Sequence, residues 1–162
     1  MTQSAPPHAP APSNTVQTID IRREVEIAAL AQAVWAAVLD ENGPGGQNYD
    51  GTPMPRVIEA WPGGRWFRDL GKGVGHLWGH VQVIKPPTLL EINGPMFMSY
   101  PGVNFIQYRL TPQGAGTRLA FVHRAMGLIP PDHATGVVKG WEFIIKRIGE
   151  KATGAKVTQR GE

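Results

Sequence analysis

Residues 132–152 read DHATGVVKGWEFIIKRIGEKA, and this stretch decides how the rest of the chain can fold. Its apolar residues recur at helical spacing and form one broad face, made of Val137, Val138, Trp141, Ile144, Ile145 and Ile148. The opposite face is charged and carries Lys139, Glu142, Lys146 and Glu150, and Gly154 provides a stop. At a rise of ~1.5 Å per residue this helix would be about 30 Å long. A one-sided helix of that length needs a sheet beneath it.

Short β-like runs precede this helix along the chain, with turn residues between them. They are RVIEAW (56–61), GRWFRDL (64–70), VGHLWGHVQVI (74–84), TLLEI (88–92), VNFIQYRL (103–110) and TRLAFVH (117–123). Together with the alternating segment TIDIRREVEI (18–27), they predict an antiparallel meander. The spacing from Leu30 to Leu39 predicts a short helix. Residues 43–55 are rich in Gly and Pro and predict a loop, of a length that is often functional.

The predicted fold class is therefore α+β, with a curved antiparallel sheet of about seven strands around the long C-terminal helix. A single helix rarely fills the whole volume inside a curved sheet, so we expect a cavity there. We assign residues 17–154 to one domain. Residues 1–16 contain four prolines and no charged side chain, and we expect a disordered tail there. We expect residues 155–162 to be a flexible C-terminal tail.

Composition excludes several classes of function. The 162 residues include no cysteine, which removes disulfides and thiolate chemistry and fits a cytoplasmic location. No apolar run approaches the ~20 residues of a membrane span, and we expect no signal sequence, because residues 1–16 have neither a basic start nor an apolar core. The net charge is +3, but Lys and Arg are spread along the chain, so we expect no nucleic-acid partner. His76 and His80 would be about 13 Å apart on one strand, too far to share an ion. We therefore expect no metal and no cofactor.

Several local signatures, taken in this order along the chain, resemble those of a known superfamily. They are Val34-Trp35, Pro62-Gly63-Gly64-Arg65-Trp66, Gly79-His80-Val81 with Pro86-Pro87, Gly116-Thr117-Arg118-Leu119 before His123, and Gly140-Trp141. The set resembles the SRPBCC or START-like superfamily with the Bet v 1-like helix-grip fold, which includes lipid carriers, birch-pollen-type allergens and bacterial polyketide cyclases. Within it, the chain looks most like the subgroup named after the activator of the Hsp90 ATPase. The resemblance implies a helix-grip fold and a ligand pocket, without ATP binding, because no phosphate-binding loop is present.

The strand 117–123 supplies the main candidate for chemistry. Leu119 and Phe121 define its inner face, so His123 should also point inward. His123 and Tyr108 are the candidate catalytic residues, although a buried histidine of this kind is more often a core residue tied to a backbone group. Arg65 is the candidate anchor for a carboxylate or phenolate. The predicted ligand-binding residues are Trp61, Trp66, Trp78, His80, Phe97, Met98, Tyr108, Phe121, His123, Met126, Trp141 and Ile145.

The sequence favours the binding or carriage of a small hydrophobic molecule, with aromatic and polyketide-like compounds among the candidates. One alternative is an enzyme of the cyclase, aromatase or dehydratase type that uses the same cavity. The other is a protein-interaction module like the Hsp90 activator. A carrier should have an almost wholly apolar pocket, an enzyme should gather polar groups in it, and an interaction module should expose an apolar patch. The sequence does not decide whether the protein forms a homodimer, nor whether residues 43–55 act as a lid.

Overall fold

Seven antiparallel strands form one sheet in the order β1-β7-β6-β5-β4-β3-β2. The computed structural model describes residues 14–96 and 99–154, so Phe97, Met98 and most of the predicted tails lie outside the described residues. The elements follow each other as β1 (Gln17–Ile27), α1 (Ala31–Glu41), β2 (Val57–Ile58), β3 (Arg65–Gly71), β4 (Val74–Lys85), β5 (Leu89–Gly94), β6 (Gly102–Gln113), β7 (Gly116–Gly127) and α2 (Pro131–Thr153). Every strand predicted from the sequence is present.

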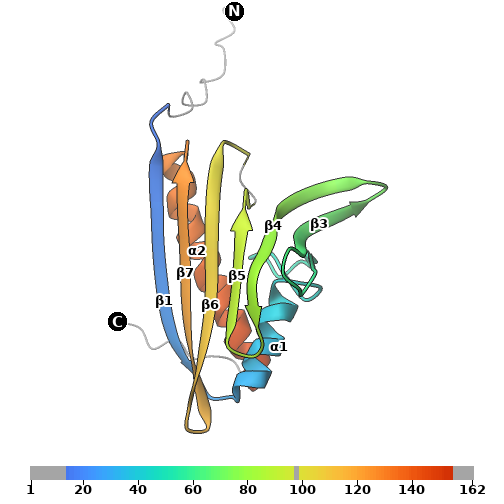
Figure 1. Cartoon of the computed structure of the whole chain (residues 1–162), viewed down its shortest axis with the longest axis vertical. Coiled ribbons are helices and arrows are strands. Elements are labelled where there is room, and N and C mark those ends of the chain that lie inside the picture. Colours follow the sequence, from blue (N-terminus) through green and yellow to red (C-terminus); the bar gives the residue numbers. More distant parts are fainter. Residues whose placement is uncertain (1–13, 97–98, 155–162) are drawn as a thin grey trace, which may run out of the picture.

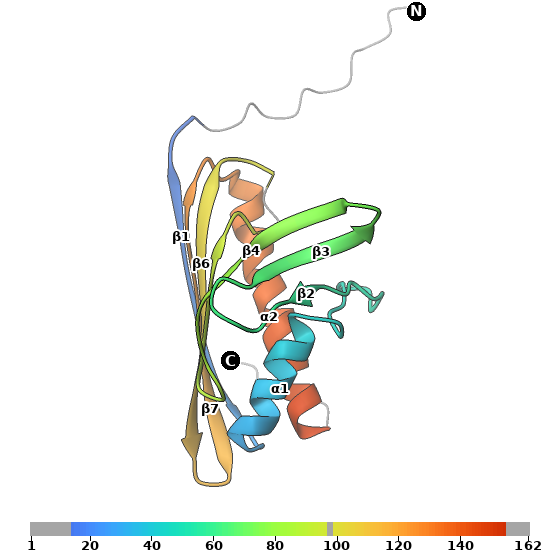
Figure 2. The same cartoon turned by 45° about the vertical axis from the view of Figure 1, so that its right-hand side comes forward.

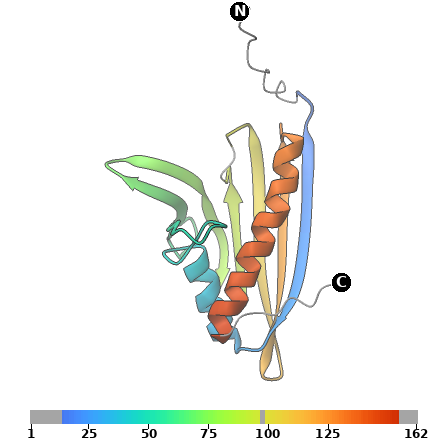
Figure 3. The same ribbon diagram turned by 180° about the vertical axis from the view of Figure 1, so that it is seen from behind.

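Helix α2 lies diagonally across one face of the long strands, and α1 lies beside its C-terminal half (Figures 1 and 3). The buried side of α2 is the predicted apolar stripe, with Val137, Trp141, Ile145 and Ile148 facing the sheet. The helix begins at Pro131 and ends where Gly154 adopts a left-handed conformation with φ of 64°. The predicted α+β class, a curved antiparallel sheet around a long C-terminal helix, is confirmed.

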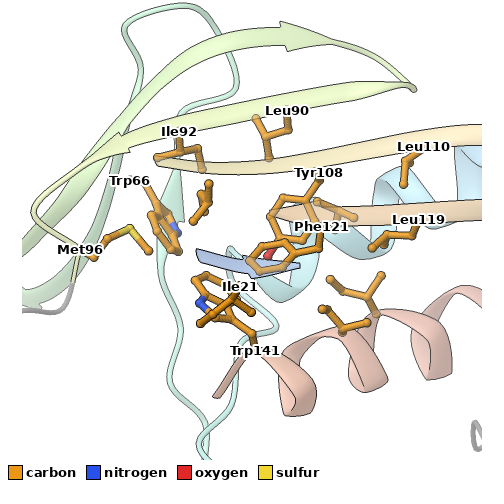
Figure 4. Packing of buried hydrophobic residues seen from close by; sticks show 14 of the residues in the cluster. Ile21, Trp66, Leu90, Ile92, Met96, Tyr108, Leu110, Leu119, Phe121 and Trp141 are labelled. Carbon is orange, nitrogen blue, oxygen red and sulfur yellow. The ribbon is translucent and has the colours of Figure 1, made fainter. Parts of the chain in front are cut away.

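Aromatic side chains fill the space between α2 and the middle of the sheet. Phe121 stands between Tyr108 and Trp141 (Figure 4), with ring centroids 5.0 Å and 4.6 Å away respectively. Tyr108, Phe121 and Trp141 are almost completely buried. Such tight packing leaves the expected cavity no room at this level of the sheet.

The β3–β4 hairpin bends away from the long strands toward the side that carries the helices (Figure 2). Two glycines allow this bend, because the backbones of β4 and β5 nearly touch there. A Cβ atom on Gly79 would lie 2.5 Å from the carbonyl oxygen of Asn93, and one on Gly94 would lie 2.4 Å from the Cα of Gly79. No side chain fits in such a gap, so glycine is needed on both strands.

A bulge in the same region changes which residues of β4 face inward. Trp66 of β3 pairs with Gly79, whereas the next residue, Phe67, pairs with Leu77. Trp78 is therefore an extra residue on β4, and the alternation of faces shifts by one position after it. Trp78 and Val81, three residues apart, are both buried as a result.

The glycine contact predicts the outcome of Gly79→Ala. We expect the variant to lose about 1–3 kcal/mol of unfolding free energy, because the new methyl group meets backbone atoms that cannot move without displacing the hairpin. Chemical denaturation of the purified variant measures this loss.

Gly136→Ala is the matched control. Gly136 lies inside α2 with no atom within 4 Å of the position of a Cβ. Alanine should keep or raise stability there, by up to about 1 kcal/mol. Equal unfolding free energies for the two variants would contradict the proposed role of the β4–β5 contact.

Candidate functional site

A pocket of about 260 Å³ lies between the N-terminal half of α2, the loop that follows α1, and the base of the β3–β4 hairpin. Its wall is mostly apolar. The lining residues are Gln47, Asn48, Tyr49, Met54, Arg56, Trp66, Trp78, His133, Gly136, Val137, Gly140, Trp141, Phe143 and Ile144. The pocket thus lies on the side of the bent hairpin, away from the middle of the sheet, which the aromatic core fills.

Helix α2 forms one wall of the pocket, and two glycines in this helix leave space for the cavity. Gly136 and Gly140 lie one turn apart and present no side chain to the pocket. Tyr49 of the loop lies over this part of α2: its hydroxyl donates to the carbonyl oxygen of Gly136 at 3.4 Å, and its ring centroid is 5.1 Å from that of Phe143. The loop and the helix therefore close one side of the pocket together.

The sheet contributes two tryptophans in an edge-to-face pair. The ring centroids of Trp66 and Trp78 are 5.1 Å apart, with an interplanar angle of 83°. The indole nitrogen of Trp66 donates to the carbonyl oxygen of Asn42 at 2.7 Å, which fixes its orientation. The bulge that turns Trp78 inward is therefore also what brings it to the pocket.

Arg56, at the end of the loop, is the charged residue of the wall. Its exposed fraction is only 4%. Its Nη2 donates to the carbonyl oxygen of Glu41 at 2.6 Å, and its guanidinium carbon lies 5.4 Å from the ring centre of Trp78. Among the residues that the structure describes, its Nε has no hydrogen-bond partner. Burial lowers the pKa of Arg56, although Glu41 opposes this effect.

The loop holds its shape through its own backbone. The amide of Arg56 donates to the carbonyl oxygen of Gly43 at 2.9 Å, and that of Met54 to Gly46 at 2.8 Å. A β-bridge joins Gln47 to Pro53. These bonds indicate a preformed wall.

Only part of the predicted binding set lies at this pocket. Trp66, Trp78 and Trp141 line it. Four other predicted residues are buried below it in the aromatic core, namely Tyr108, Phe121, His123 and Ile145. They do not belong to the lining.

Three predicted binding residues face solvent. Met126 is 57% exposed because β7 alternates and its neighbour Ala125 points inward. Trp61, also 57% exposed, lies in the turn after β2. His80 is exposed because Val81, paired with the buried Ile92, takes the inward position after the bulge. We did not foresee this shift of face from the sequence.

Arg65, the predicted anion anchor, is exposed and already paired. Its Nε and Nη2 bind the carboxylate of Glu59 at 2.7 and 2.9 Å. The hydrogen bonds from Arg65 lower the pKa of Glu59 to about 2. Arg65 pairs with His80 across the two strands, away from the pocket. Arg56 lines the pocket, whereas Arg65 does not.

His123 points inward, as the alternation of β7 predicts, and both its ring nitrogens have partners. The indole N–H of Trp141 donates to Nδ1 at 2.9 Å, so the proton lies on Nε2, which is 2.8 Å from Oδ1 of Asn104. Burial lowers the pKa of His123 to about 4. The imidazole is therefore neutral at pH 7 and is tied to side chains rather than to the backbone.

Tyr108 is similarly enclosed. Its hydroxyl lies 3.2 Å from Nδ2 and 3.4 Å from Oδ1 of Asn42. Burial raises the pKa of Tyr108 well above its usual value. Catalytic roles for His123 and Tyr108 stay predictions, and this geometry gives both residues a structural role first.

The residues missed by the sequence analysis come from the loop and from residues 133–144 of α2. Tyr49, Met54 and Arg56 belong to or adjoin the Gly- and Pro-rich segment, whose length was the available signal. Phe143 lay outside the apolar stripe that we traced on α2. Across residues 14–96 and 99–154, no three acidic or histidine side chains cluster as a metal site. No helix in those ranges has both the length and the hydropathy to cross a bilayer.

Comparison with known proteins gives likenesses of structure only. No family model matches the chain, and no curated protein sequence does either. The Mll3558 protein from Rhizobium loti has a TM-score of 0.66 at 20% identity, over 85% of this chain and 99% of that one. Ara h 8.0201 has a TM-score of 0.62 at 14% identity, over 85% and 99%. DynU16, a protein of the dynemicin biosynthetic locus, has a TM-score of 0.57 at 19% identity, over 85% of this chain and 48% of that one.

These likenesses define the class of fold. The seven-stranded curved sheet and its C-terminal helix match the Bet v 1-like helix-grip architecture. These likenesses extend to the fold alone. At such low sequence identities, a shared fold does not identify the ligand or the activity, so both must be argued from the pocket itself.

Burial of His123 predicts a pH-dependent stability. The unfolded histidine, with a pKa near 6.5, takes up a proton before the folded one, whose pKa is about 4. Stability should therefore be full above about pH 6.5 and fall by up to about 3 kcal/mol as the pH drops to about 4.

Denaturant titrations at pH 7 and at about pH 4.5, on the wild type and on His123→Gln, measure this effect. The variant should be less stable at pH 7 but should lose less stability on acidification. Equal losses in the two proteins would show that His123 is not the responsible group.

Proposed function

We propose that the protein binds and carries a small hydrophobic molecule in the pocket between α2, the loop after α1 and the β3–β4 hairpin. The observation that carries this proposal is the wall itself, which is preformed and largely aromatic, with Trp66, Trp78 and Trp141 around one space. Its volume of about 260 Å³ is slightly below the ~300–1,000 Å³ of sites for drug-sized ligands. A flat molecule of about one or two rings fits this size and wall best.

A carrier agrees with the chemistry of the pocket better than a cyclase or dehydratase does. An enzyme of that type needs proton-transferring groups in contact with the bound chain. His123 and Tyr108 lie beneath the wall with their polar atoms already bonded. The wall itself supplies His133, whose Nδ1 is hydrogen-bonded to the hydroxyl of Tyr100 and whose pKa is lowered by burial. The enzymatic alternative would have to use this pair.

Filling the pocket tests the proposal. Gly136→Leu places a side chain on the wall, where nothing lies within 4 Å of the position of a Cβ, and leucine favours the helix. We expect the wild type to bind 2-naphthamide, a neutral aromatic probe, and the variant to bind it at least about tenfold more weakly. Isothermal titration calorimetry measures both affinities.

Thr135→Leu is the matched control, since Thr135 is exposed on the neighbouring position of α2 and does not line the pocket. It should bind the probe like the wild type. Equal weakening in both variants would contradict carriage in this pocket.

The interaction-module alternative has one observation in its favour. Exposed apolar side chains gather on β2, the following turn and the β3–β4 hairpin, and they are Val57, Trp61, Leu70, Val74 and Leu77. Figure 2 shows this hairpin projecting from the sheet. A surface of this kind suits a protein partner, as in the Hsp90-activator subgroup.

The rate of ATP hydrolysis by a purified Hsp90 chaperone separates the two functions. For a carrier, we expect no change in this rate on adding the protein. A stimulation that the double variant Leu70→Ser/Leu77→Ser abolishes would favour the interaction module instead.

A further inference from the structure

Within the described residues, not every cation near the pocket is hydrogen-bonded to a carboxylate, and Arg56 is one that is not. The carboxylate of Glu41, which is fully buried, is bound by Arg147 through Nε at 3.0 and 3.1 Å and by Nζ of Lys151 at 2.8 Å. Lys151 also binds Asp40 at 2.6 Å. The two carboxylates are thus taken by cations from α2. Among the described residues, Arg56 hydrogen-bonds to the backbone carbonyl oxygen of Glu41 and to no carboxylate, and the charge of Glu41 stabilises it only through space.

A second guanidinium group lies nearby in a similar state. Arg68 follows Trp66 by two residues on β3, so the two side chains share a face of the strand. The charge of Arg68 opposes that of Arg56 and contributes to lowering its pKa. Within the described part of the chain, the buried side-chain polar atoms that lack a hydrogen bond are Nε of Arg56 and Nε of Arg68.

Burying an unpaired donor of a charged group costs free energy, so native proteins rarely keep one without a ligand or another use for it. The cost here is greater because the two cations repel each other. The loop is also shaped around Arg56: a Cβ on Gly46 would lie 2.0 Å from Nη2 and 2.8 Å from Nε. The backbone therefore leaves space for the guanidinium at the pocket wall.

We infer that the ligand of this pocket is an amphipathic anion, a small aromatic molecule with one carboxylate that accepts hydrogen bonds from Arg56. Its apolar body lies against Trp66, Trp78 and Trp141, and Arg68 adds positive charge behind the anionic end. This inference rests on the proposed binding function and adds the charge of the ligand. Inorganic anions lack the apolar body, so phosphate alone should not occupy the pocket.

A matched pair of probes tests the inference on the wild-type protein. 2-Naphthoate and 2-naphthamide have the same ring and nearly the same size, but only the first is charged at pH 7. We expect 2-naphthoate to bind at least about tenfold more tightly in calorimetry. Added salt should weaken 2-naphthoate binding and leave 2-naphthamide binding nearly unchanged. Millimolar phosphate, at constant ionic strength, should not compete with 2-naphthoate.

Two variants locate the effect. Arg56→Met keeps an apolar side chain against Trp78, and the ratio of the two dissociation constants should fall to about one. Arg65→Met removes an exposed arginine outside the pocket and should keep the wild-type ratio. The salt dependence of the wild type serves as the test if Arg56→Met does not fold.

Each outcome bears on a different claim. Equal affinity of both probes for the wild type, a preference that survives Arg56→Met, or competition by phosphate would overturn the aromatic-anion inference and leave carriage intact. Binding of neither probe would instead overturn the binding function, and the inference with it.

Discussion

The contact between the backbones of β4 and β5 at Gly79 and Gly94 is the constraint on which the site depends. With no side chain on either residue, β4 crosses β5 closely enough to bend, and the β3–β4 hairpin turns toward the helices. The bend and the bulge beside it bring Trp66 and Trp78 opposite α2. A flat continuation of the sheet would leave both tryptophans facing solvent, and the pocket would have no wall on this side.

Trp141 joins the pocket to the core of the protein. Its indole N–H binds His123, its ring packs on Phe121, and it also lines the pocket. The aromatic core below it is tightly filled and has its polar atoms paired, which favours rigidity over chemistry. The pocket above it is apolar except at its edge. This division gives the inward-facing histidine and tyrosine, the candidate catalytic residues, a structural role as support for the pocket wall.

The fold could be predicted from the sequence because its signals are periodic. The apolar stripe of α2 and the alternation of β7 identified the helix and the inward side of His123 correctly. The site was harder to predict, for two physical reasons. The bulge at Trp78 reverses the faces that simple alternation gives to β4, so His80 points outward. Ion pairing is also invisible in one sequence: Arg65 is paired with Glu59, whereas Nε of Arg56 has no hydrogen-bond partner among the described residues.

The loop after α1 has a consequence for how such a protein can diverge. Its shape is held by hydrogen bonds within its own backbone, and side chains such as Gln47, Asn48 and Met54 contribute to the pocket without belonging to the fully buried core. Substitutions there alter the shape and polarity of the wall at little cost to folding. The loop part of the wall can therefore change independently of the tryptophans that the pocket shares with the core, so one scaffold can acquire new specificities while its core stays the same.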